Sequence, residues 1–159
     1  MTDAHRGWLP STELILRVPA GLEQVIPPEY EDRNGHMNVK HYYELQTTTV
    51  WRLFHRLGFA RDEKREQGTF SLEQHLRYHN EVLVGHKVST HACVLGRTDK
   101  IIRGMSFLVN RTTDEVANTL EFVSANVDLT QRRTSPFPAH LADAIDRDMA
   151  SYPLDLTAR

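Results

Sequence analysis

The sequence of 159 residues contains one cysteine, Cys93, and no long apolar stretch. A single cysteine excludes an internal disulfide and a metal site built from several cysteines, so we interpret Cys93 as a small buried apolar residue. No stretch approaches the roughly 20 apolar residues of a membrane-spanning helix. The first ten residues also lack the apolar core of a secretory signal. These absences predict a cytoplasmic protein without a membrane partner.

The sequence also lacks a strong excess of positive or negative charge, with a formal net charge of −2. This balance gives no indication of a nucleic-acid partner. Nine histidines are present, but they show neither the helical HExxH spacing nor a set of cysteine partners, so we predict no metal site. The length fits one domain over residues 1–159, with an N-terminal extension over 1–20 and a C-terminal helix and tail over 138–159.

The sequence predicts a long helix from Val39 to Leu57. Its apolar residues recur at intervals of three and four, as on one face of an amphipathic helix. Asn38 suits the N-cap, since its side-chain oxygen can accept a backbone N–H of the first turn, and Gly58 suits the C-terminal position that adopts a left-handed conformation. Three consecutive threonines (47–49) are poor helix formers, so we expect packing against a sheet to stabilise this helix.

The rest of the chain predicts strands. Short polar links indicate that the strands after the helix are antiparallel neighbours in a meander, and alternation in the third of these predicts one buried face. Residues 61–68 are read as a loop or short helix, and Ala139–Met149 as a second helix. The predicted strands are Glu13–Val18, an edge strand within Glu23–Glu31, Thr69–Tyr78, Val84–Gly96, Lys100–Asn110 and Val116–Asp128.

One long helix against one curled antiparallel sheet is the economical way to bury both apolar faces. The predicted fold class is therefore α+β, with a central helix wrapped by a sheet of about five strands. That arrangement is the layout of a hotdog fold.

An acid, a glycine turn and a helix start follow one another in the segment from Asp32 to Asn38 (Asp-Arg-Asn-Gly-His-Met-Asn). The start of a helix offers unpaired N–H groups and the positive end of the helix dipole. Acyl transfer needs a nucleophile or base together with a place for the developing oxyanion. The segment is compatible with that chemistry, although an aspartate in a turn is more often only a turn former.

This segment, followed by Tyr42, resembles the opening motif of hotdog acyl-CoA thioesterases of the 4-hydroxybenzoyl-CoA thioesterase type. The similarity continues through Phe70–Tyr78, Val82–Gly85 and Ser135–Pro138. This longer pattern is closest to betainyl-CoA thioesterases and to the thioesterase domain fused to carnitine dehydrogenases. One departure is His86, where the wider family has aspartate; we expect it to affect a turn and leave the chemistry intact.

The resemblance implies an acyl-CoA thioesterase in which Asp32 is the catalytic carboxylate and the backbone N–H of Val39 stabilises the oxyanion. Coenzyme A is then part of the substrate and no separate cofactor is needed. The leading substrate is betainyl-CoA, hydrolysed to glycine betaine and CoA in carnitine catabolism. The family also implies a homodimer or homotetramer with sites between subunits. The alternatives are a hotdog hydratase or dehydratase and a non-catalytic acyl-CoA-binding protein.

Two further residues of the motif have both a structural and a functional interpretation. Asn38 can cap the helix, and it can also position a water beside Asp32. His36 can orient the Asp32 carboxylate or bond only to the backbone.

Five more residues are candidates for substrate binding. Glu73 and His75 share one face of a strand by the period of two. They either form a solvated or interfacial polar face, or they point at the helix, where they line the acyl pocket or tune Asp32. Tyr42, Tyr43 and Trp51 are helix-core candidates. If the acyl group carries a quaternary ammonium, Tyr43 and Trp51 are also candidates for an aromatic box, with Glu73 as its acid.

Overall fold

The long helix α2 (Val39–Leu57) lies where the apolar spacing predicts it in the computed structural model, which describes residues 8–59, 66–154 and 156. Asn38 caps the helix by accepting the Lys40 N–H at 3.1 Å, and Gly58 follows it in the left-handed conformation with φ of 104°. Two of the three threonine hydroxyls bond within the helix, since Thr47 donates to the Tyr43 carbonyl and Thr49 donates to the Leu45 carbonyl. The predicted helix and both of its caps are confirmed.

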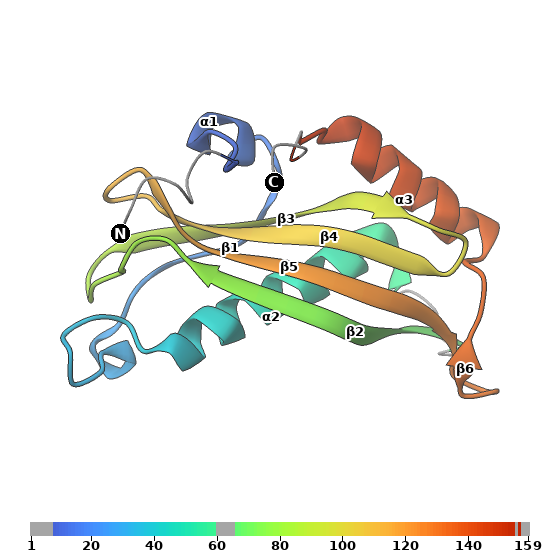
Figure 1. The fold of residues 1–159 in the computed structure, drawn as a ribbon, viewed down its shortest axis with the longest axis horizontal. Coiled ribbons are helices and arrows are strands. Elements are labelled where there is room, and N and C mark those ends of the chain that lie inside the picture. Colours follow the sequence, from blue (N-terminus) through green and yellow to red (C-terminus); the bar gives the residue numbers. More distant parts are fainter. Residues whose placement is uncertain (1–7, 60–65, 155, 157–159) are drawn as a thin grey trace.

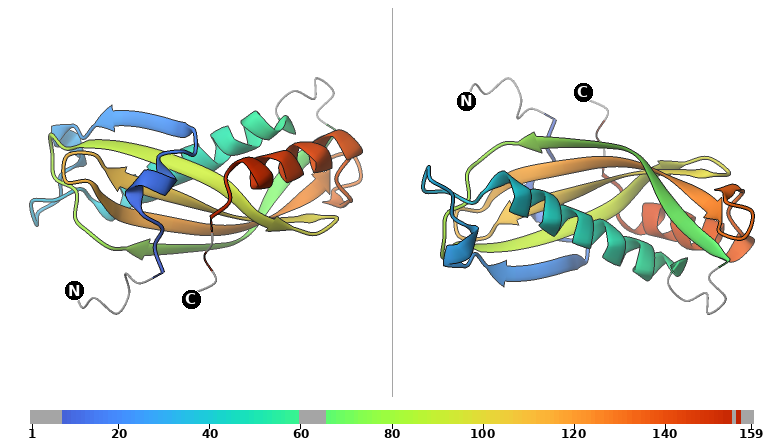
Figure 2. Two further views of the ribbon diagram at one scale, coloured as in Figure 1. Left: turned by 90° about the horizontal axis from the view of Figure 1, so that it is seen from above. Right: turned by 90° about the horizontal axis from the view of Figure 1, so that it is seen from below.

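A six-stranded antiparallel sheet wraps α2, which crosses one of its faces diagonally (Figure 2). The strand order is β1-β3-β4-β5-β2, with β6 beside β5. This arrangement confirms the α+β hotdog fold. The strands are β1 (Ala20–Val25), β2 (Gln67–Tyr78), β3 (Lys87–Arg97), β4 (Ile101–Asn110), β5 (Glu115–Asp128) and β6 (Arg133–Thr134).

The predicted four-strand meander is wrong in one pairing. Only β3, β4 and β5 follow one another through tight turns, whereas β2 pairs with β5 and forms the edge of the sheet opposite β1. The link from β2 to β3 spans residues 79–86, long enough to carry the chain from one edge of the sheet toward the other. A hairpin between neighbouring strands needs only a few residues, so the longer link was a signal against direct pairing. The short strand β6 was also missed.

The N-terminal predictions need a second correction. Glu13–Val18 does not form a strand, because the short helix α1 (Thr12–Ile15) begins there with Ser11 as its cap. The Ser11 hydroxyl accepts the Leu14 N–H at 3.3 Å, an N-cap signal that the strand interpretation overlooked. An edge strand does follow, but β1 ends before the prolines, and a 3-10 turn over Pro28–Tyr30 replaces its predicted second half.

Both faces of the central strands are buried, whereas the alternation in β4 predicted one buried face. In Figure 1, α1 and α3 (Ala139–Ser151) lie above the sheet and α2 lies below it. Met105 and Phe107 pack toward the α1 side, and Leu108 packs toward α2. Cys93 belongs to the cluster under α1; it is fully buried, and burial raises the pKa of its thiol to about 12, as expected for an inert core residue.

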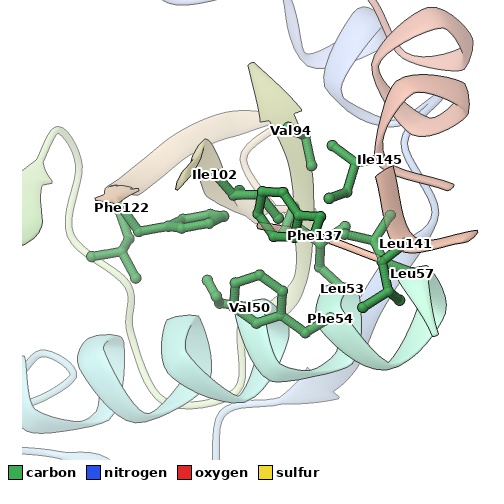
Figure 3. Packing of buried hydrophobic residues seen from close by; sticks show 12 residues of the cluster. Val50, Leu53, Phe54, Leu57, Val94, Ile102, Phe122, Phe137, Leu141 and Ile145 are labelled. Carbon is green, nitrogen blue, oxygen red and sulfur yellow. The ribbon is translucent and has the colours of Figure 1, made fainter. Parts of the chain in front are cut away.

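The largest apolar cluster joins the two long helices around the end of β3. Leu57 of α2 lies next to Leu141 of α3, Phe137 lies beside them, and Ile145 lies next to Val94 of β3 (Figure 3). The C-terminal helix was predicted in place, but its role in covering this end of the sheet was not visible in the sequence.

An ion pair completes the edge of β3 where β1 does not reach. β1 pairs with β3 only as far as His91. Beyond that point, the guanidinium of Arg56 donates to the Ala92 carbonyl at 3.1 Å, and the carboxylate of Asp148 accepts the Val94 N–H at 3.4 Å. Arg56 and Asp148 also bond to each other at 2.8 Å. The pair thereby takes the hydrogen-bonding place of a missing strand.

Asp148→Ala is therefore expected to lower the free energy of unfolding by about 3 kcal/mol, because it leaves Arg56 and a backbone N–H without their acceptor. Chemical denaturation at pH 7 measures this loss. Asp146→Ala is the matched control, since Asp146 pairs with Arg97 on the exposed side of the same helix. Exposed pairs are screened by water, so this variant should remain close to the parent. Equal losses in the two variants would contradict the role given to Asp148.

Candidate active site at the start of the long helix

Asp32 lies in a closed loop directly before α2. Backbone pairing of Glu31 with Met37 closes the base of the loop. Within it, the Asp32 N–H donates to the His36 carbonyl at 2.9 Å, and the Gly35 N–H donates to the Asp32 carbonyl at 3.1 Å. Gly35 has φ of 82°, a conformation that favours glycine. The loop therefore fixes the acid next to the first turn of the helix.

The Asp32 carboxylate has one oxygen committed to the loop and one that faces His36. Oδ1 accepts the Asn34 N–H at 2.7 Å, whereas Oδ2 lies 3.8 Å from Nδ1 of His36. The same ring nitrogen lies 3.5 Å from the Met37 carbonyl. Both interpretations of His36, beside the acid and beside the backbone, therefore fit its position. The Asp32 side chain is 18% exposed, so the carboxylate remains accessible to a small reactant.

The amide of Val39 is open at the helix start. The neighbouring amides are used, since Asn38 donates to the Tyr30 carbonyl and Lys40 donates to the Asn38 side chain. Within the described part of the chain, no acceptor lies in hydrogen-bond range of the Val39 N–H. The first amides of a helix point outward along its axis. This donor is therefore free to bind an oxygen placed at the helix end.

Two contacts fasten the acid-bearing loop to the helix. The Tyr42 hydroxyl accepts the Val82 N–H at 3.0 Å, and the Val82 carbonyl in turn accepts the Met37 N–H of the loop at 2.8 Å. Tyr30, which precedes the loop, stacks face to face on His41 with ring centroids 3.7 Å apart. The stacking of Tyr30 on His41 was not predicted. A stacked pair is not visible in sequence spacing, because one partner lies outside the helix.

Burial raises the pKa of Tyr42 to about 12, and the nearby negative charges of Glu81 and Asp32 add to the shift, while the Val82 hydrogen bond opposes it. Tyr42 therefore remains a neutral phenol at physiological pH. It is 3% exposed and belongs to the core, as predicted.

Glu73 and His75 do not point at the helix. They pair with Val123 and Glu121 of β5, whereas Gln74 between them pairs with Phe122, which packs against α2. Since side chains alternate along a strand, Glu73 and His75 lie on the face turned away from α2. There they line an open hollow of about 630 Å³. The prediction that they point at the helix is wrong, and their role in substrate binding stays a prediction.

Trp51 is also separated from the first turn of the helix. It lies two helical turns beyond Tyr43, about 12 Å along the axis, is 61% exposed, and its nearest ring is that of His55. An aromatic box of Tyr43, Trp51 and Glu73 therefore does not form within one chain. Tyr43 itself does lie near the site, one turn after Val39.

A second hollow of about 620 Å³ lies at the opposite end of α2, lined by residues such as Phe59, His140 and Arg147. It is a helix length away from Asp32 and is not part of this site. Among the described residues, no group of three or more His, Cys, Asp or Glu side chains is placed to hold a metal ion. Within the same residues, no helix is both long and apolar enough to cross a bilayer.

The family model described as "Thioesterase-like superfamily" matches residues 26–145, which include the loop, α2 and most of the sheet. The chain belongs to the thioesterase-like superfamily. As a member it is a thioester hydrolase, and the predicted family and hotdog fold are confirmed.

Among curated proteins, this thioesterase is similar to the L-carnitine dehydrogenase/betainyl-CoA thioesterase of Agrobacterium fabrum. The two are 28% identical over 116 residues, which cover 72% of this chain and 24% of that protein. The chain thus spans about a quarter of the length of this relative.

Solved structures share the fold of the thioesterase. A hypothetical protein from Staphylococcus aureus in complex with CoA superposes with a TM-score of 0.77 at 20% identity, covering 89% of this chain and 94% of that one. A thioesterase from Thermus thermophilus complexed with coenzyme A and zinc gives 0.67 at 19% identity, covering 80% and 98%.

The expectation for His86 agrees with the structure of the thioesterase. Nδ1 of His86 accepts the Leu83 N–H at 3.3 Å, across the turn that contains Gly85 with φ of 84°. An aspartate carboxylate can accept the same N–H group. The substitution therefore keeps the turn and does not involve the loop of Asp32.

Proposed function

We propose that the chain hydrolyses a small acyl-CoA, with Asp32 as the catalytic carboxylate and the Val39 N–H as the oxyanion donor. The observation that carries this proposal is that one hydrogen-bonded unit holds an accessible carboxylate beside an open helix amide. Acyl transfer requires both groups at one carbonyl.

In this reaction the thioester carbonyl oxygen accepts the Val39 N–H at the positive end of the helix dipole. Asp32 either attacks the carbonyl carbon, giving a mixed anhydride that water then cleaves, or takes a proton from the attacking water. Both routes release CoA as the thiol and the acyl group as a carboxylate. Both also place negative charge on the carbonyl oxygen in the transition state, where the amide stabilises it.

The proposed substrate is betainyl-CoA, converted to glycine betaine and CoA. Support comes from the name of the Agrobacterium relative, and support for a CoA ester in general comes from the two CoA-bound structural neighbours. Asn38 contributes as the cap that orients the first helical turn, and His36 as the neighbour of the carboxylate.

We propose further that the working form is a homodimer joined along β2. This strand is an edge of the sheet, and large exposed side chains such as Phe70, Leu72 and Tyr78 lie along it. An unpaired edge of this length with exposed apolar side chains is a template for pairing with a second chain. Pairing there would also close the open side of the site next to Tyr43.

The experiment that tests this function is a thiol-release assay over a panel of acyl-CoA esters that includes betainyl-CoA, acetyl-CoA and a 2-enoyl-CoA. We expect stoichiometric release of CoA thiol with betainyl-CoA. Loss of the enoyl absorbance without thiol release would indicate a hydratase instead. Binding of the esters without turnover would indicate an acyl-CoA-binding protein, and either result would overturn the proposal.

A further inference from the structure

An open strip of side chains runs from the start of α2 to the edge strand β2. Val39 and Tyr43 are four residues apart on the helix and therefore lie on one face, one above the other. The Tyr43 hydroxyl donates to Oε1 of Gln74 on β2 at 2.7 Å, which holds its ring across the gap between helix and sheet. The ring begins one helical turn from the proposed oxyanion donor.

Tyr78 adds a second ring to this strip. It lies four residues after Gln74 and on the same face of β2, where its ring meets that of Tyr42 at 5.3 Å and an angle of 83°. Tyr43 and Tyr78 are 46% and 42% exposed, so both have open surface. Partial burial raises the pKa of Tyr78, so its ring carries a neutral phenol at physiological pH.

The electrostatic surroundings favour a cation beside these rings. The charges of Glu81 and Asp32 both act on Tyr42, which touches Tyr78. Within the described residues, no lysine or arginine lies over the ring of Tyr43 or Tyr78, whereas Arg56 and Arg77 do lie over Tyr152 and Trp8 elsewhere. Among the described residues, the strip thus offers two open aromatic rings with no lysine or arginine over either, beside a tyrosine on which two carboxylates act.

From this geometry we propose that Tyr78 and Tyr43 determine specificity for an acyl group that carries a quaternary ammonium. Such a group has no N–H to donate, so it is recognised by aromatic faces and nearby carboxylates. This inference rests on the proposed function, because it places the cationic end of the acyl group beside the carbonyl held at Val39. It assigns the aromatic surface to β2 and the first turns of α2, in place of Trp51 and Glu73.

The test compares two thioesters of the same shape that differ in charge. Betainyl-CoA carries a trimethylammonium group, and 3,3-dimethylbutyryl-CoA carries a tert-butyl group in the same position. The change in the ratio of kcat/KM between the parent and a variant measures recognition of the charge, because the two esters are matched in size and the inductive effect of the ammonium on the carbonyl is the same in both enzymes. We expect the parent enzyme to prefer betainyl-CoA, and Tyr78→Leu to lower the ratio about tenfold.

Matched variants separate this effect from damage to the fold. Tyr78→Phe keeps the aromatic face and should keep the ratio. Trp51→Leu removes an exposed aromatic side chain two helical turns beyond Tyr43 and should leave the ratio unchanged. Tyr43→Leu provides an independent reduction of the ratio if Tyr78→Leu fails to fold or to assemble, as judged by circular dichroism and light scattering.

Two results would overturn the inference while leaving the proposed hydrolysis intact. One is a ratio near one in a parent enzyme that hydrolyses both esters and loses both activities on Asp32→Asn. The other is an unchanged ratio in folded Tyr78→Leu and Tyr43→Leu. Failure of the proposed function is a different observation, namely an Asp32→Asn variant that hydrolyses both esters at the parental rate.

Discussion

Asp32→Asn is expected to lower kcat for thioester hydrolysis by about three orders of magnitude, within the range for loss of a general base. The amide that replaces the carboxylate can neither attack the carbonyl nor accept a proton from water. It can still accept the Asn34 N–H that the carboxylate accepts through Oδ1, so the loop should keep its shape. Thiol release under saturating betainyl-CoA measures the effect.

A second aspartate provides the control for this variant. Asp128 makes the same local turn contact, since its Oδ1 accepts the Thr130 N–H two residues on at 2.8 Å. Asp128→Asn should retain the parental kcat and a similar melting temperature. If Asp32→Asn retains the parental rate as well, Asp32 is only a turn residue and the account of the site is wrong.

Val39→Pro is expected to lower kcat by about 10²–10³, the typical effect of removing one oxyanion donor. Proline lacks the backbone N–H, and the first position of a helix is where proline is tolerated best. The preceding Asn38 already has the extended backbone that a residue before proline prefers, with ψ of 140°. The substitution therefore deletes one donor and leaves the helix start in place.

The matched variant is Val39→Ala, which shortens the exposed side chain and keeps the N–H. It should remain within a few-fold of the parental kcat, and both variants should have melting temperatures near that of the parent. Equal rates in Val39→Pro and Val39→Ala would show that the amide takes no part in the reaction. A large loss in both would assign the effect to the side chain.

The long helix could be predicted to the residue because its signals are local. The apolar period, the cap at Asn38 and the glycine at position 58 all act within a few residues of the chain. The same holds for the contacts that close the loop of Asp32 on itself, which join residues at most six positions apart. The bond from the Met37 N–H to the distant Val82 carbonyl is the exception.

Features that depend on pairing between distant segments could not be predicted in the same way. The direction in which Glu73 and His75 point follows from the register of β2 against β5. The predicted meander paired β2 with β3 instead, so this register could not be derived. Burial of both faces of β4 depends on α1 and on residues near the C-terminus that cover the second face. A strand with Gly104 and Ser106 between apolar residues looks half-buried until those segments are placed.

The strip formed by Tyr43 and Tyr78 combines a residue placed by local sequence with one placed by tertiary contact. Tyr43 was a candidate as an aromatic residue of the long helix, whose position local spacing predicts. Tyr78 was not a candidate for the site, and its meeting with Tyr42 appears only when β2 lies along α2. The mechanism rests on local sequence, whereas the proposed specificity rests on tertiary contact.

The most direct test of the central claim is a crystal structure of Asp32→Asn with betainyl-CoA bound. The account predicts the thioester carbonyl oxygen about 3 Å from the Val39 nitrogen, within hydrogen-bond range, and the carbonyl carbon facing the side chain at position 32. A thioester bound elsewhere, for example in the hollow beside His140 and Arg147, with the Val39 amide facing only solvent, would contradict it.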